Sequence, residues 1–184
     1  MKIFLQVLIA AGLVWISSEM LEVVMGGRTP LTLWITAVFH LLMAFGIWGA
    51  YGSQAGGRGT LSLVGAVMAS LGYFILIYPP IAVSQSATLT ISEYIGGSIY
   101  FRFAGMLAVF GTIAFGFSVW RTRSYPMWIG IVLMVCPAVF VSVLLAGGPD
   151  LVVITANVVQ SIALIAMGRD GLRRLPHAIG FAAG

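Results

Sequence analysis

Long uninterrupted apolar runs dominate the chain, and short polar segments separate them. Six of the runs are close to the length of a helix that crosses a hydrocarbon core, which takes about 20 residues. None alternates polar and apolar residues as barrel strands do, and a backbone inside lipid must pair its own polar groups, so the runs indicate helices. The predicted spans are 3–25, 31–51, 60–83, 99–120, 125–145 and 151–167.

The composition agrees with a chain that lies in lipid. Of the 184 residues, 60% are hydrophobic and only 8% are charged, and the mean hydropathy is +1.08. About a quarter of the residues are charged in an ordinary soluble domain, so this apolar surface needs lipid or protein against it. The sequence therefore predicts an all-α, polytopic membrane protein: a single six-helix domain over residues 1–184, in which residues 172–184 form a cytoplasmic tail.

Basic residues are divided unequally between the two ends of the predicted bundle. Six spans place both termini at one end, and that end carries most of the positive charge. Lys and Arg in short connections mark the cytoplasmic side, so we expect both termini in the cytoplasm. The end with the termini carries Lys2, Arg58, Arg121, Arg123, Arg169, Arg173 and Arg174, whereas the other end carries Arg28 and Arg102.

Prolines and small residues indicate how the spans bend and pack. Pro79 and Pro80 should end or bend the third span, and Pro137 should kink the fifth or loosen its hydrogen bonds. The longest connection, 84–98, suits a short interfacial helix or a lid. Close packing between helices in lipid requires small side chains. The fourth span offers a stripe of them, at Ala104, Ala108, Thr112 and Gly116.

Polar residues gather in the half of the bundle away from the termini. Ionisable residues inside spans normally face a cavity or a partner, because exposing them to hydrocarbon costs about 2.5–3.5 kcal/mol. We therefore predict an outward-opening polar vestibule among the first, second, fourth and sixth spans. Its candidate ligand-binding residues are Glu19, Glu22, Thr36, His40, Tyr100, Arg102, Asn157 and Gln160.

Each candidate also has an ordinary structural interpretation. The two glutamates can reach outer water, with Glu22 paired to Arg28 or Arg102. His40 can be a packed histidine bonded to a helix carbonyl or a glutamine, which is commoner than a ligand. The amide side chains of the sixth span can bond neighbouring helices. Both sets of interpretations remain open at the level of sequence.

Several chemistries lack the residues that they need. A bis-histidine haem requires a second intramembrane histidine, and a retinal Schiff base requires an intramembrane lysine. The chain has one cysteine and two histidines, which is too few for an ordinary zinc site. A zinc site made of His40, Glu19 and Glu22 remains an alternative. It carries no phosphate-binding loop or hydrolase motif. A basic patch with interleaved aromatics is also missing, which argues against nucleic acid as a partner. No cofactor can be named.

Two segments resemble a known group of proteins. The segment HLLMAFGIWGAY from His40 to Tyr51, with the Gly/Arg-rich turn and residues 61–67 after it, resembles the opening hairpin of small uncharacterised bacterial integral membrane proteins. Residues 120–128 are similar to the turn between their fourth and fifth helices. The resemblance implies a bacterial cytoplasmic (inner) membrane. In topology, the chain is also similar to the substrate-binding subunits of energy-coupling vitamin transporters.

These observations favour a non-catalytic integral membrane subunit or accessory protein of a larger membrane assembly. Its expected partners are the lipid bilayer and either other membrane subunits or further copies of the chain. The alternative is a binding or transport module for a small solute or lipid that uses the polar vestibule. A membrane enzyme acting on a lipid or isoprenoid, with Glu19 or Glu22 as general acid or base, is a third hypothesis.

Overall fold

The computed structural model describes residues 1–54, 59–86, 94, 97–146 and 148–180, with residues 144 and 176–180 described for the backbone alone. All regular elements in these ranges are α-helices, which confirms the all-α fold. The connection 84–98, expected to form a short interfacial helix or a lid, falls mostly outside the described residues, and Arg58 falls outside them. The helices are α1 (Lys2–Met25), α2 (Pro30–Gly52), α3 (Thr60–Ile75), α4 (Tyr78–Ser84), α6 (Ile99–Thr122), α7 (Met127–Ala146) and α8 (Asp150–Gly180).

Six segments of this bundle are apolar spans. Five are long and apolar enough to cross a membrane: α1, α2, α6, the stretch Thr60–Ser84 that joins α3 to α4, and Asp150–Leu175 of α8. The sixth, α7, is apolar over the shorter stretch Met127–Val143. The structure is therefore a multi-pass helical bundle with the predicted six spans.

The last helix is longer than the sequence pattern indicates. The prediction ended it at residue 167, where hydropathy falls, but α8 continues through Arg169 and Arg173 to Gly180. A helix does not need lipid around it, and an ion pair one turn apart, between Asp170 and Arg174, supports this polar extension. Part of the predicted tail is thus helical.

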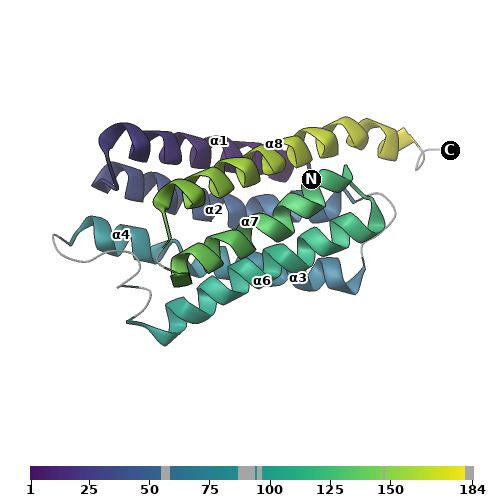
Figure 1. The fold of residues 1–184 in the computed structure, drawn as a ribbon. Helices are drawn as coiled ribbons and strands as arrows, with labels where there is room; N and C mark the ends of the chain where they lie inside the picture. The colour runs from purple at the N-terminus through teal and green to yellow at the C-terminus, as the bar shows by residue number, and fades with distance from the viewer. Residues whose placement is uncertain (55–58, 87–93, 95–96, 147, 181–184) are drawn as a thin grey trace.

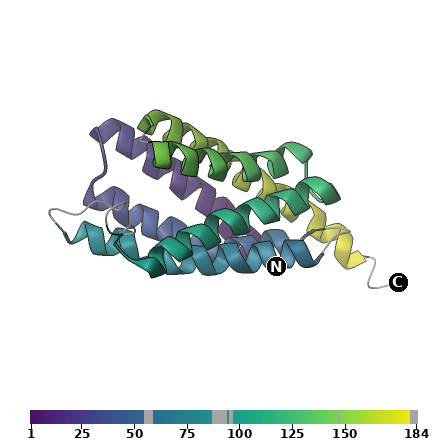
Figure 2. The same cartoon turned by 60° about the horizontal axis from the view of Figure 1, so that its bottom comes forward.

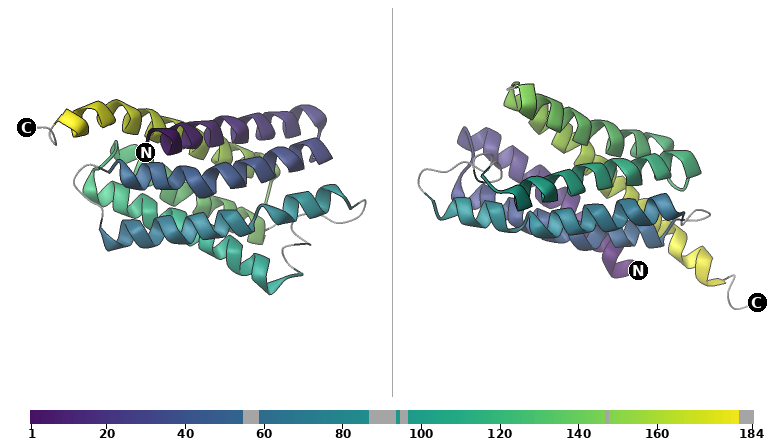
Figure 3. Two further views of the ribbon diagram at one scale, coloured as in Figure 1. Left: turned by 180° about the vertical axis from the view of Figure 1, so that it is seen from behind. Right: turned by 90° about the horizontal axis from the view of Figure 1, so that it is seen from below.

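The six spans form a closed ring. Each packs against the spans that precede and follow it in the chain, and α8 closes the ring by packing against α1. Figures 1, 2 and 3 show this arrangement, with both termini at the same end of the bundle as the α2–α3 and α6–α7 connections. The candidate polar residues near the ends of α1 and α8 therefore meet although they are far apart in sequence.

Glycine allows the closest contact in the ring, between α3 and α6. A Cβ atom built on Gly65 would lie 2.6 Å from the backbone nitrogen of Phe115, and one on Gly72 would overlap the backbone of Ala108. The predicted small-residue stripe of α6 is buried along its whole length. Backbones this close gain the dispersion contacts that hold helices together in lipid, where the hydrophobic effect contributes little.

Two prolines divide the third span into α3 and α4. Pro79 and Pro80 stand in the first turn of α4, where a missing N–H group is tolerated. Pro80 has no N–H to donate to the carbonyl of Leu76 four residues earlier, so the helical ladder is interrupted at that point. The predicted break is confirmed. By contrast, α7 continues as a single helix through Pro137.

A second set of contacts ties together the end of the bundle that holds the termini. The buried Tyr125 lies in the α6–α7 turn, and its hydroxyl donates to the carbonyl of Ala50, 3.0 Å away, near the end of α2. Ser53 bonds the same hydroxyl. Arg174 of α8 donates to the carbonyl of Ser124 and lies over the Tyr125 ring. These contacts satisfy carbonyl groups that helix ends leave free.

Replacing Gly72 by alanine should destabilise the bundle, because the new Cβ pushes α3 away from α6. We expect a loss of about 1–3 kcal/mol, the usual cost of overpacking, read as a lower midpoint of thermal unfolding in detergent. Gly105→Ala is the matched control, since a Cβ there meets nothing within 4 Å. Equal midpoints for the two variants would contradict the close contact.

Candidate functional site

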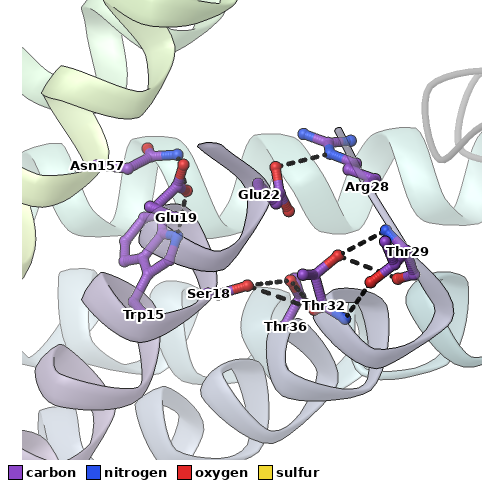
Figure 4. A network of polar contacts seen from close by, with 9 residues as sticks. All are labelled: Trp15, Ser18, Glu19, Glu22, Arg28, Thr29, Thr32, Thr36 and Asn157. Carbon is purple, nitrogen blue, oxygen red and sulfur yellow. Dashed lines mark hydrogen bonds and ion pairs between the residues drawn. The ribbon is translucent and has the colours of Figure 1, made fainter. Parts of the chain in front are cut away.

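The centre of the polar cluster is a buried carboxyl on α1. Glu19 is only 6% exposed, and its Oε1 accepts two hydrogen bonds (Figure 4). One comes from the indole N–H of Trp15, 2.9 Å away and one turn earlier on α1. The other comes from the side-chain amide of Asn157 on α8, at 2.6 Å. Glu19 therefore links the first and last spans, where the ring closes.

Ser18 provides the corresponding link between α1 and α2. Its hydroxyl lies 3.3 Å from both the carbonyl of Thr32 and the hydroxyl of Thr36. Thr36 in turn donates to the Thr32 carbonyl, 2.9 Å away. Thr32 also forms a reciprocal cap with Thr29 that begins α2. One short stretch of α1 thus binds both of its neighbours in the ring through polar groups.

Glu22 lies one turn beyond this cluster and has a different role. Its carboxylate pairs with Arg28 across the α1–α2 turn, with 3.4 Å between the nearest atoms. The two residues flank Gly26, whose positive φ of 71° ends α1. The Arg28 side chain is half exposed, so the pair contributes at most about 1 kcal/mol. The structure thereby shows which arginine is the partner of Glu22.

His40 occupies the point where the third span breaks. Its Nδ1 lies 2.8 Å from the carbonyl oxygen of Leu76, the group for which Pro80 has no N–H. A carbonyl only accepts, so Nδ1 is the atom that carries the proton. The His40 ring also packs in tilted contacts against the rings of Phe39 and Tyr73, with 5.4 Å and 5.9 Å between ring centroids. The structure therefore places His40 as a packed histidine that repairs an interrupted helix.

Gln160 points to the middle of the ring. It is buried on α8, and it interacts with the hydroxyl of Tyr73 on α3, as does Thr112 of α6. The third, fourth and sixth spans (α3, α6 and α8) therefore share one polar contact. This contact is separate from Glu19, whose hydrogen bonds go to Trp15 and Asn157.

Tyr100 and Arg102 lie apart from the other candidates. Both are exposed side chains in the first turn of α6, and α6 packs against α3 and α7. Of the four spans predicted to form the vestibule, α1, α2 and α8 bring polar residues into contact, whereas Tyr100 and Arg102 of α6 lie elsewhere in the ring.

Two open surface hollows lie in the described part of the molecule, and neither is lined by a candidate residue. One, of about 370 Å³, is an open groove between α7 and α8. The other, of about 220 Å³, lies at the α6–α7 turn and is lined by Trp120, Arg121, Arg123 and Met127. The groove between α7 and α8 is lined by Cys136, Val139, Leu151, Val152, Thr155, Ala156 and Val159.

Among the described residues, no three His, Cys, Asp or Glu side chains lie close enough to hold a metal ion.

Sequence reasoning missed Trp15 and Tyr73 as members of these networks. Trp15 stands four residues before Glu19, the spacing at which helical side chains meet, so the bond could have been found. Tyr73 gives no such signal, because its partners lie on other spans.

The fold and its polar contacts define a multi-pass α-helical membrane protein. No protein-family model matches the chain, and neither a curated protein nor a solved structure matches it.

Changing Glu19 to leucine should destabilise the bundle, because the N–H groups of Trp15 and Asn157 lose their shared acceptor. Leaving buried donors unpaired costs about 1–3 kcal/mol, measured as a lower thermal midpoint in detergent. Glu19→Gln keeps an acceptor oxygen, so its thermal midpoint should stay near that of the parent. Glu22→Leu, at the half-exposed pair, is the matched control. A parent-like midpoint for Glu19→Leu would contradict the linking role.

The repair of the α3–α4 break can be tested by combining two changes. His40→Phe should lower the thermal midpoint, because it leaves the Leu76 carbonyl without a donor. Pro80→Ala restores a backbone N–H four residues after that carbonyl. In the Pro80→Ala background, His40→Phe should therefore lower the thermal midpoint clearly less than it does in the parent. Equal costs in both backgrounds would show that the histidine does not act through this carbonyl.

Proposed function

We propose that the protein is a non-catalytic integral membrane subunit or accessory protein of a larger membrane assembly. One observation carries the proposal: the intramembrane polar groups are engaged with each other and with backbone carbonyls. Glu19 binds Trp15 and Asn157, and His40 binds a carbonyl. A ligand or catalytic site instead presents convergent polar groups to a hollow.

The outer surface of the ring supports an assembly partner. Large apolar side chains are exposed on every span, among them Val24 at 82% and Phe110 at 57%. Such a surface suits lipid chains and the apolar faces of neighbouring subunits. The polar residues on α1, α2 and α8 then serve to fix the shape of the ring that a partner would recognise.

The proposed location is the cytoplasmic membrane of a bacterium, with both termini in the cytoplasm. The seven basic residues at the end with the termini, against two at the other, support this orientation through the positive-inside rule. The resemblance to small bacterial six-helix membrane proteins supports the bacterial assignment. The similarity in topology to vitamin-transporter subunits agrees with a role inside an assembly.

A second candidate is a lipid-binding module, favoured by the groove between α7 and α8. Its lining is almost wholly apolar, and the hydroxyl of Thr155 is already bonded to the carbonyl of Leu151, 2.7 Å away. A groove of this chemistry on a membrane helix suits an acyl chain. It replaces the polar vestibule as the place where a lipid would be held.

Gentle solubilisation tests the proposal. Extracted from its native membrane in a mild detergent, the protein should run in a particle larger than one 19.6 kDa chain with its micelle. Two differently tagged copies, expressed together, separate an assembly of identical chains from one with other subunits. Recovery of a lone monomer under these conditions, with chemical crosslinking before extraction giving no larger species, would contradict the proposal.

A further inference from the structure

We propose that the hollow at the α6–α7 turn binds the phosphate of an anionic phospholipid. The hollow of about 220 Å³ is lined by Trp120, Arg121, Arg123 and Met127. It lies at the end of the ring opposite Glu19 and belongs to neither polar network. The inference is therefore independent of the proposed assembly role.

Two arginines that have no carboxylate partner in the described part of the chain line this hollow. Arg121 and Arg123 are two residues apart, and the ion pairs within the described residues belong to other arginines, Arg28 and Arg174. Guanidinium groups bind phosphate through paired N–H donors, which gives geometric as well as electrostatic preference. A phosphate bound in the hollow would be attracted by both charges.

The backbone at Arg123 supports a binding role. Its φ of 50° makes it the one residue other than glycine with a positive φ in the described part of the chain. The left-handed position after a helix is normally taken by glycine, because a side chain is strained there. Arg123 ends α6 in this conformation, and it lines the hollow together with Arg121. Strain of this kind clusters at binding sites.

The remaining lining residues favour a lipid over a free anion. Trp120 is 40% exposed and Met127 50% exposed, so both present apolar surface at the rim of the hollow. Tryptophan at the end of a span is typical of the headgroup region. The hollow also lies at the end that carries most of the basic residues, and juxtamembrane basic groups attract anionic lipids. The hollow thus combines arginines that can bind a phosphate with apolar side chains that can contact an acyl chain.

The experiment compares lipid binding to the purified protein by native mass spectrometry and thermal unfolding. Phosphatidylglycerol should bind more tightly, and raise the midpoint more, than phosphatidylcholine with the same acyl chains. The Arg121→Gln, Arg123→Gly double variant should lose about 30-fold in phosphatidylglycerol affinity, as expected for two surface charges. Glycine fits the left-handed position, so this variant should fold at least as stably as the parent.

The Arg169→Gln, Arg173→Gln variant is the matched control, since it also removes two exposed charges from the same end of the bundle, outside the hollow. It should keep most of the preference for phosphatidylglycerol. Equal binding of the two lipids by the parent would overturn the proposal, as would an equal loss in the control and in the Arg121→Gln, Arg123→Gly variant. Stabilisation by inorganic phosphate as large as that by phosphatidylglycerol would also overturn it, because the site would then recognise a free anion.

Discussion

A polar group inside a membrane must find its partner within the protein, and the shape of this ring follows from how that requirement is met. Glu19 is the most demanding case, because a buried carboxyl without donors is costly in lipid. Its donors come from the same helix and from α8, 138 residues away. This one side chain therefore joins the first and last spans at the point where the ring closes.

The same requirement explains the less regular parts of the bundle. Where the prolines interrupt the third span, His40 supplies the donor that the backbone lacks. At the opposite end, Tyr125 and Arg174 cover carbonyl groups of α2 and of the α6–α7 turn. Glycine then permits the close contact of α3 with α6 that polar groups alone would not provide. The interruption of the third span is thus matched by a side chain from another span.

The sequence predicted the features that depend on local composition. It could not predict which side chains meet, because that depends on how each helix is rotated about its own axis. Hydropathy located six spans and the proline break, and the pairing of Glu22 with Arg28 was among the alternatives. Hydropathy could not show that Asn157 faces Glu19 whereas Arg102 lies on a helix that packs elsewhere, because every face of these spans is apolar. It also ended α8 at residue 167, since a drop in hydropathy marks the edge of lipid rather than the end of a helix.

The central claim is that the bond between Glu19 and Asn157 holds α1 against α8. A double-mutant cycle with Glu19→Leu and Asn157→Leu, followed by reversible unfolding in mixed micelles, measures that interaction directly. The account predicts a coupling free energy of at least about 1 kcal/mol, within the range for residues in one network. A second double-mutant cycle, of Glu19 with Arg102, should show no coupling free energy. A coupling of zero between Glu19 and Asn157 would contradict the account.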